Sequence, residues 1–564
     1  MEALDWLVIG VFFLALIGII VWVVRQKQND SADYFLGGRD ATWLAIGASI
    51  FASNIGSEHL IGLAGAGASS GMAMAHWEIQ GWMILILGWV FVPFYTRSMV
   101  YTMPEFLERR YNPQSRTILS VISLVSYVLT KVAVTVYAGG LVFQQVFGIK
   151  ELWGIDFFWI AAIGLVVLTA LYTIFGGMKS VLYTSVLQTP ILLLGSLIIL
   201  VLGFKELGGW DEMMRVCGAV TVNDYGDTMT NLIRSNDDAN FPWLGALIGS
   251  AIIGFWYWCT DQFIVQRVLS GKNEMEARRG TIFGAYLKLL PVFLFLIPGM
   301  IAFALHQKYI GAGGEGFLPM LANGTANADA AFPTLVAKLL PAGVKGLVVC
   351  GILAALMSSL ASLFNSSAML FTIDFYKRFR PETPEKKLVG IGQVATVVIV
   401  ILGILWIPIM RSVGDVLYTY LQDVQSVLAP GIAAAFLLGI CWKRTSAQGG
   451  MWGLIAGMVI GLTRLGAKVY YSNAGEVADS TFKYLFYDMN WLFFCGWMFL
   501  FCIIVVIVVS LATKAPTAEK IQGLVFGTAT KEQKAVTRAS WNHWDIIHTV
   551  IILAITGAFY WYFW

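Results

Sequence analysis

The chain has 564 residues, of which 58% are Ala, Val, Ile, Leu, Met, Phe, Trp, Tyr or Cys and only 13% are charged, and its mean hydropathy is +0.73. Soluble domains are far less apolar, so the composition excludes a soluble protein and predicts an integral membrane protein. The formal net charge of +3 gives no sign of a nucleic-acid-binding surface, and neither a nucleic acid nor an obligate protein partner is expected.

Most of the apolar runs are longer than the roughly 20 residues that cross a bilayer as a helix, which predicts an all-α fold. The first run, 4–24, has no basic segment before it and no small-residue cleavage site after it, so we expect a retained anchor rather than a signal peptide. In chain order we expect about fourteen spans, near 4–24, 42–70, 77–99, 117–147, 152–174, 180–204, 241–266, 280–307, 343–376, 387–410, 414–441, 447–471, 486–512 and 543–563.

Lys and Arg are distributed unevenly between the two alternating sets of loops. The set at 25–41, 97–116, 175–180, 267–279, 377–387, 442–446 and 513–541 holds about 24 of the 37, against about ten in the opposite set. Positive residues favour the cytoplasmic side, so we expect a multi-pass protein of the cell membrane, either a plasma membrane or a bacterial inner membrane. Both termini are then expected outside.

The second span is interrupted by polar residues in "FASNIGSEHLIGLAG", residues 51–65. Such a break frees backbone carbonyls and amides that lipid does not satisfy, so it survives only where it lines a cavity in the protein. Secondary transporters use broken helices of this kind to coordinate a cation and hold a substrate. The serines of the ninth span, among them Ser358 and Ser359, are expected to reach the break. Hydroxyl and carbonyl oxygens without a formal charge suit sodium better than magnesium or calcium, which favour carboxylates.

Charged side chains at membrane depth are the next candidates, because each one costs several kcal/mol unless it faces the protein interior. Glu78 and Lys288 are the strongest, with an interfacial carboxylate and a snorkelling lysine as the structural alternatives. Lys131 is interpreted as structural, and Asp261 and Gln262 are expected to brace the inner end of their span.

Several segments together resemble the sodium–solute symporter family, and within it the sodium–glucose cotransporter branch. They are "ASNIGSEHLIGLAGAG", "YTMPEFLERRYN", "ALYTIFGGMKSVLYT", "WYWCTDQFIVQRVLSGKN", "YLKLLP", "LMSSLASLFNSSAMLFTIDFYKR" and "AAAFLLGICWKR", and the resemblance covers about residues 35–470. It implies a LeuT-like core of two inverted five-helix repeats, 42–204 and 241–441, with a broken helix. Residues 1–35 then form an extra N-terminal helix and linker, and 447–564 form extra C-terminal helices.

The resemblance also implies the residues of the substrate site. The family residues that hold a bound hexose match Asn54, His59, Glu78, Lys288 and Gln422, and the aromatic pair beneath the sugar matches Tyr257 and Trp258, with Trp256 beside them. The outer hydrophobic gate matches Leu63, Trp77 and Tyr418, and Tyr257 closes the inward path. Gly254 stands where relatives often have a Ser, Thr or Asn that contacts the sugar, which leaves room and one hydrogen bond fewer.

The main sodium site of the family uses backbone carbonyls that match Ala52, Ile55 and Ala355 and hydroxyls that match Ser358 and Ser359. Ser185 stands where many relatives have an Asp, and Ala361 where some members with two sodium ions have a Thr. Both differences remove ligands proposed for a second sodium ion, so one sodium per substrate is expected.

These features predict a sodium-coupled symporter that imports a neutral hexose of the glucose or galactose type by alternating access, with Na⁺ as the co-transported ion. Another polyol such as myo-inositol, and then an organic acid or amino acid, are the alternative substrates. A sodium-linked sugar sensor or channel is the non-transport alternative. Neither an enzyme nor an organic cofactor is expected, because an intramembrane enzyme would need a catalytic dyad or a metal set, and no HExxH motif is present.

Overall fold

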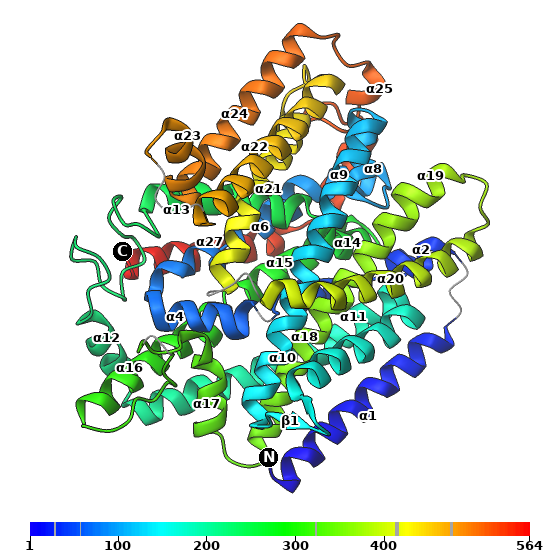
Figure 1. Ribbon diagram of the computed structural model, residues 1–564. Helices are drawn as coiled ribbons and strands as arrows, with labels where there is room; N and C mark the ends of the chain where they lie inside the picture. Colours follow the sequence, from blue (N-terminus) through cyan, green and yellow to red (C-terminus); the bar gives the residue numbers. More distant parts are fainter. Residues whose placement is uncertain (27–29, 57, 322–323, 412–416, 474–477) are drawn as a thin grey trace.

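The computed structural model describes residues 1–26, 30–56, 58–321, 324–411, 417–473 and 478–564; for residues 129–130, 145, 409–411, 417–423 and 472–473 it describes the backbone alone. The described chain is almost entirely helical (Figure 1). The one named sheet among these residues is a two-stranded antiparallel hairpin that pairs Glu151 with Asp156 and Leu152 with Ile155.

The elements of the first half are, in chain order, α1 (Ala3–Arg25), α2 (Ser31–Leu36), η1 (Gly37–Arg39), α3 (Trp43–Asn54), η2 (Glu58–Leu63), α4 (Ala64–Ser70), η3 (Gly71–Met74), α5 (Ala75–Glu78), α6 (Gly81–Ile86), η4 (Leu87–Phe91), α7 (Val92–Ser98), α8 (Met103–Arg110), α9 (Pro113–Ser126), η5 (Tyr127–Val132), α10 (Ala133–Phe147), β1 (Glu151–Leu152), β2 (Ile155–Asp156), α11 (Phe157–Leu207) and α12 (Trp210–Gly218).

The elements of the second half are α13 (Trp243–Gly254), η6 (Phe255–Thr260), α14 (Gln262–Leu269), α15 (Glu274–Lys288), η7 (Val292–Leu296), α16 (Ile297–Gly311), η8 (Ala328–Ala330), α17 (Ala331–Leu339), α18 (Val344–Met369), η9 (Leu370–Tyr376), α19 (Lys377–Phe379), α20 (Glu385–Arg411), α21 (Leu417–Cys441), α22 (Ala447–Asn473), α23 (Thr481–Lys483), η10 (Tyr484–Asp488), α24 (Trp491–Ala512), α25 (Ala518–Ile521), α26 (Lys531–Ala539) and α27 (His543–Tyr562).

The expected break in the second span is confirmed. Helix α3 ends at Asn54, and Ile55 has extended backbone angles (φ −82°, ψ 107°) before helical structure resumes in the π-helical segment η2. A Cβ atom on Gly56 would lie 2.5 Å from Glu58 Oε2 and 2.9 Å from Ser359 Oγ. The glycine therefore leaves space that the side chains of Glu58 and Ser359 occupy beside the break, and a larger residue would have to displace them.

Helix α11 contains two of the expected spans, 152–174 and 180–204, and the chain turns sharply between them. Gly177 has non-helical angles (φ 52°, ψ −147°), which glycine adopts without a steric penalty. The Ser180 hydroxyl donates a 3.0 Å hydrogen bond to the Tyr172 carbonyl eight residues earlier. In a straight helix eight residues rise about 12 Å, so the bond shows that the chain bends back on itself.

Helix α18 is the central element of the fold. It packs against α1, α3, α10, α11 and α20. In the stretch Val344–Phe379, which α18 begins, 89% of the 18 most apolar consecutive residues are buried, against 22% in α1. The outer face of α1 carries exposed apolar residues such as Leu7, Val11 and Leu14. An exposed apolar face on a long helix is typical of contact with lipid, so we place α1 at the lipid boundary. Figure 1 shows α1 at the edge of the molecule, whereas α18 lies in the core.

The C-terminal helices form two peripheral units. Helices α22 and α24 pack on α21 at one end of the molecule (Figure 1), and glycines bring α21 and α22 together: a Cβ on Gly457 would lie 2.6 Å from Gly431 Cα. The last helix, α27, packs on α6 and α15, and its Thr549 hydroxyl accepts a 2.9 Å hydrogen bond from Trp89 Nε1. The last helix therefore braces the segment that carries Glu78.

Eleven helical stretches within the described ranges are long and apolar enough to cross a membrane, and two shorter apolar helices, Trp43–Asn54 and Ala133–Gln144, accompany them. Some stretches, such as Phe157–Leu207, contain more than one expected span. The count of about fourteen stays a prediction, as do the boundaries at 1–35, 42–204, 241–441 and 447–564.

Candidate functional site

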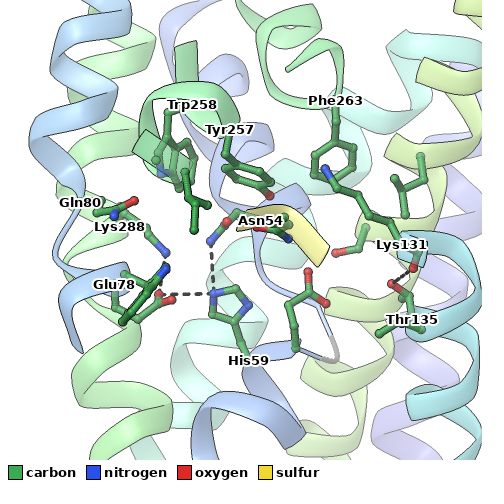
Figure 2. A pocket seen from close by; sticks show the side chains of 18 residues that line it. Asn54, His59, Glu78, Gln80, Lys131, Thr135, Tyr257, Trp258, Phe263 and Lys288 are labelled. Carbon is green, nitrogen blue, oxygen red and sulfur yellow. Dashed lines mark hydrogen bonds and ion pairs between the residues drawn. The ribbon is translucent and has the colours of Figure 1, made fainter. Parts of the chain in front are cut away.

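A cavity of about 70 Å³ lies beside the broken helix, between the two halves of the chain. Figure 2 shows Gln80, Glu78 and Lys288 on one side of it and Lys131 and Thr135 on the other. The lining residues are Asn54, Glu58, His59, Trp77, Glu78, Gln80, Lys131, Val134, Thr135, Ile253, Gly254, Tyr257, Trp258, Phe263, Lys288, Ser359, Leu363 and Gln425.

Three π-helical segments supply many of these side chains. His59 lies on η2, Lys131 on η5, and Tyr257 and Trp258 on η6. A π-helical turn contains an extra residue, which changes the direction of the side chains around it and is frequent at functional sites. The polar lining thus depends on local departures from α-helical geometry.

Glu78 and Lys288 form an ion pair on one side of the cavity. Lys288 Nζ lies 2.6 Å from Glu78 Oε2, and the two side chains are 4% and 2% exposed. His59 Nε2 lies 3.3 Å from the same carboxylate oxygen and 3.3 Å from Asn54 Nδ2. The four predicted residues therefore form one connected polar group across the break (Figure 2).

This polar group has hydrogen-bonding capacity left over. Among the described residues, His59 Nδ1 and Trp77 Nε1 are buried and have no hydrogen-bond partner. An ammonium group has three N–H donors, and the hydrogen bond to Glu78 uses one of those of Lys288. Buried polar atoms are normally paired, so these groups indicate a polar occupant of the cavity.

A second ion pair lies on the opposite side. Lys131 Nζ lies 2.7 Å from Asp261 Oδ2, and the Tyr127 hydroxyl donates to Asp261 Oδ1. The Lys131 ammonium lies 4.8 Å from the ring centres of both Tyr257 and Phe263. Asp261 braces its helix as the sequence predicts, but Lys131 also lines the cavity, which its interpretation as a structural residue missed.

The predicted aromatic and gate residues occupy different places. Tyr257 and Trp258 line the cavity with their rings at 87° to each other. Trp77 also lines it and stacks on Trp491 with ring centres 5.5 Å apart. Two further predicted residues are buried but are absent from the described cavity lining: Leu63 and Trp256.

Two predictions fall on helix α21, which contributes Gln425 to the lining. The side chains of Gln422 and Tyr418 lie outside the described residues. Their roles in substrate binding and in the outer gate stay predictions.

The predicted sodium ligands lie where α3 ends against α18. The Ser359 hydroxyl is 3.0 Å from the Ser53 carbonyl oxygen and 3.1 Å from the Ile55 carbonyl oxygen. Ser358 lies one residue earlier on α18, with its hydroxyl 3.3 Å from that of Ser185. Carbonyl and hydroxyl oxygens thus converge beside the break, a donor set that suits a monovalent cation.

The remaining predicted ligands are Ala52 on α3 and Ala355 on α18, and both are buried at this contact. Ser53 was missed: its hydroxyl lies 2.6 Å from that of Ser362, and its carbonyl faces Ser359. The break itself is the signal that could have drawn attention to Ser53, since every carbonyl next to it is a candidate ligand.

Gln80 was missed as well, because the sequence indicates one continuous span over 77–99. The structure interrupts this span at Ile79 and Gln80, between α5 and α6, and the Gln80 side chain lines the cavity beside Gly254. A Cβ atom on Gly254 would overlap Gln80 Oε1 and lie 2.9 Å from Gln80 Cδ. The room expected at Gly254 is therefore taken by the Gln80 amide.

Comparisons with known proteins agree with this arrangement. The model of the sodium:solute symporter family matches residues 34–457. The chain belongs to this family. It is 36% identical over 542 residues to the sodium/myo-inositol cotransporter 2 of Mus musculus, covering 94% of this chain and 80% of the relative. It is also 36% identical over 537 residues to the sodium/glucose cotransporter 4 of Danio rerio, covering 92% and 80%.

A solved structure of a sodium-coupled sialic acid symporter in a substrate-bound, outward-open state shares the fold. Its TM-score is 0.72 at 22% identity, and the match covers 92% of this chain and 99% of that one. The expected LeuT-like, all-α membrane fold is thus confirmed, and the family member described here is a multi-pass, sodium-coupled solute symporter.

Proposed function

We propose that this symporter imports a neutral cyclic polyol together with sodium, and that myo-inositol is the leading candidate for this polyol. The observation that carries the proposal is the charge balance of the cavity: its described lining contains two carboxylates, Glu58 and Glu78, and two ammonium groups, Lys131 and Lys288. An organic anion would favour a cationic excess. A neutral polyol, whose hydroxyls both donate and accept, suits a balanced mixture of donors and acceptors.

The residues proposed to hold the polyol are Asn54, His59, Glu78, Lys288 and Gln422, with Tyr257 and Trp258 against its C–H face and Trp256 behind them. Four of these form the connected group on one side of the cavity. The relatives named as myo-inositol cotransporters support the choice of substrate, because their sequences match this chain over almost its full length.

Glucose or galactose is the second candidate. The relative named as a sodium/glucose cotransporter is 36% identical, the same value as for the myo-inositol relatives. A hexose in its pyranose form and an inositol are both six-membered rings with mostly equatorial hydroxyls. A sequence identity of 36% to both kinds of relative therefore leaves the choice of substrate to a few pocket contacts.

One sodium ion is proposed per polyol, held by the carbonyls of Ala52, Ile55 and Ala355 and the hydroxyls of Ser358 and Ser359. Ser185 has no negative charge to hold a second ion, and its hydroxyl donates a 2.6 Å hydrogen bond to the Val181 carbonyl of its own helix, which favours a structural role. No enzymatic step or organic cofactor belongs to the proposal.

The proposed mechanism is alternating access, with the repeats 42–204 and 241–441 rocking about the site and both termini outside. Leu63, Trp77 and Tyr418 close the outer side and Tyr257 the inner side. One charge moved through 100 mV supplies about 2.3 kcal/mol, and a tenfold sodium gradient adds about 1.4 kcal/mol. Together they support a polyol ratio of about several hundredfold.

The test is uptake of radiolabelled myo-inositol, glucose and galactose into proteoliposomes, with an inward sodium gradient compared with an equal potassium gradient. We expect sodium-dependent accumulation of myo-inositol, and a charge-to-polyol ratio of one in voltage-clamped flux measurements. Binding without accumulation would identify a sensor. Sodium-dependent uptake of an organic acid or amino acid, without polyol uptake, would refute the substrate assignment.

A further inference from the structure

Gln80 occupies an unusual position at the cavity wall. It lies in the two-residue junction between α5 and α6, where the backbone is not helical (φ −89°, ψ 23°), and it is 3% exposed. Its Nε2 donates a 2.8 Å hydrogen bond to the Ser250 carbonyl on α13. A carbonyl only accepts hydrogen bonds, so this contact fixes the orientation of the amide: nitrogen toward Ser250 and oxygen away from it.

Gly254 follows Ser250 by one helical turn and lies against the same amide. A side chain at position 254 would overlap Gln80 Oε1 and lie 3.1 Å from Nε2. Gln80 and Gly254 therefore form a complementary pair: the long amide occupies the space because the glycine leaves it, and any residue with a Cβ at 254 displaces the amide.

The Gln80 amide oxygen is available as an acceptor. No described residue donates a hydrogen bond to it, although the side chain lines the cavity. In Figure 2 the amide lies on the same side as Lys288 and Glu78. An amide oxygen in the cavity wall, on the same side as the donors of Lys288, provides an acceptor that suits a ligand with several hydroxyls.

We infer that Gln80 is a specificity-determining residue for the transported polyol. Its Oε1 accepts a hydrogen bond from one substrate hydroxyl and so replaces, from the junction between α5 and α6, the hydrogen-bonding group that Gly254 lacks. The inference rests on the proposed function, because it assumes that the cavity holds a polyol. It differs from a bracing role, in which the amide only ties α6 to α13 through Ser250.

The first test uses myo-inositol analogues in which one hydroxyl at a time is replaced by fluorine, which cannot donate a hydrogen bond. In the wild-type protein we expect one analogue to have its KM for sodium-dependent uptake raised by about three- to tenfold, the effect of one lost hydrogen bond. In Gln80→Met that analogue and myo-inositol should have similar KM values, while the other analogues keep their wild-type penalties.

Gln393→Met is the matched control. Gln393 on α20 also donates its Nε2 to a backbone carbonyl of another helix, that of Ile174 at 3.1 Å, but it is absent from the described cavity lining. We expect it to retain the wild-type analogue profile. If Gln80→Met also retains that profile, or raises the KM of every analogue by the same factor, Gln80 is a bracing residue and the inference is wrong.

The second test exploits the pairing with Gly254. In the wild-type background Gly254→Ser should raise the KM for myo-inositol, because the new side chain displaces the Gln80 amide. In the Gln80→Ala background the same substitution should lower the KM, because the serine hydroxyl then takes over the contact. An equal effect of Gly254→Ser in both backgrounds would overturn the inference.

The outcomes separate the inference from the proposed function. If the wild-type protein accumulates no polyol under a sodium gradient, both are wrong. If it accumulates myo-inositol and the two tests show no dependence on Gln80, only the inference is wrong. Size-exclusion profiles and thermal stability in detergent identify variants that fail to fold, and only folded variants enter the comparison.

Discussion

The Glu78–Lys288 ion pair allows the sharpest test of the site. Its charges are 2.6 Å apart and almost completely buried. At an effective dielectric constant of about 20, two unit charges at this distance attract each other by about 6 kcal/mol, which offsets a desolvation cost of several kcal/mol for each ion. Removing one partner leaves the other charge buried, so Lys288→Met or Glu78→Gln alone should destabilise the protein by about 3–5 kcal/mol.

The double variant Glu78→Gln/Lys288→Met removes both charges and should regain most of that stability. If the pair also binds the polyol, none of the three variants should accumulate myo-inositol. Stability is measured as thermal unfolding in detergent, and uptake in proteoliposomes with a sodium gradient.

Two results would refute this reasoning. Wild-type uptake by the double variant would show that the pair only packs the helices together and does not bind substrate. A single variant as stable as the wild type would show that the charges are not held in a dry contact.

Three further predictions follow from the other contacts. Ser359→Ala should raise the sodium concentration for half-maximal uptake by about tenfold or more, because a hydroxyl ligand is lost, whereas Ser270→Ala, which removes a hydroxyl that donates to a carbonyl of its own helix, should leave it unchanged; equal effects would contradict the assigned ligands. Asp261→Asn should lower thermal stability and uptake, because it leaves the Lys131 ammonium buried without a carboxylate, and adding Lys131→Met should restore the stability; an unaltered single variant would argue against the pair. Burial raises the pKa of the Asp329 carboxyl in η8 from 3.8 to about 6, so the folded arrangement binds the proton more tightly and its stability falls as pH rises from about 4 to 6. Hydrogen exchange of peptides covering η8 and α17 should therefore slow as pH is lowered through that range, after correction for intrinsic rates, and Asp329→Asn should abolish the effect.

The sequence predicts the break and its neighbours well, because polar groups within a membrane span cannot face lipid. A run of polar residues and glycine in an apolar span has to face protein, so the sequence alone is enough to place Asn54 and His59 at an internal cavity. The charged residues Glu78 and Lys288 follow from the same cost argument. Their contact with each other, across 210 residues of sequence, depends on how the helices pack and is not readable from either segment.

The residues that were missed depend on local geometry that leaves no clear mark in the sequence. Lys131 reaches the cavity because η5 is π-helical, and an insertion of one residue in a helical turn has no compositional signature. Gln80 faces the cavity because α5 and α6 are separated by a non-helical junction inside an apolar run. The effect of Gly254 on the pocket could not be predicted from the sequence around Gly254, since it depends on the Gln80 side chain from a distant segment of the chain.

The break also provides a physical link between the two proposed binding sites. The carbonyls of Ser53 and Ile55 face Ser359 on α18, while the side chain of Asn54, between them in sequence, contacts His59 in the polyol site. A sodium ion that binds the Ile55 carbonyl and the Ser359 hydroxyl would therefore also fix the backbone that carries Asn54. Coupling between binding sites is reciprocal, so the factor by which sodium lowers the Kd for the polyol must equal the factor by which the polyol lowers the Kd for sodium. Asn54→Ala should bring this shared factor close to one without altering the sodium-coordinating oxygens, and a variant that still binds the polyol with the wild-type factor would contradict this link.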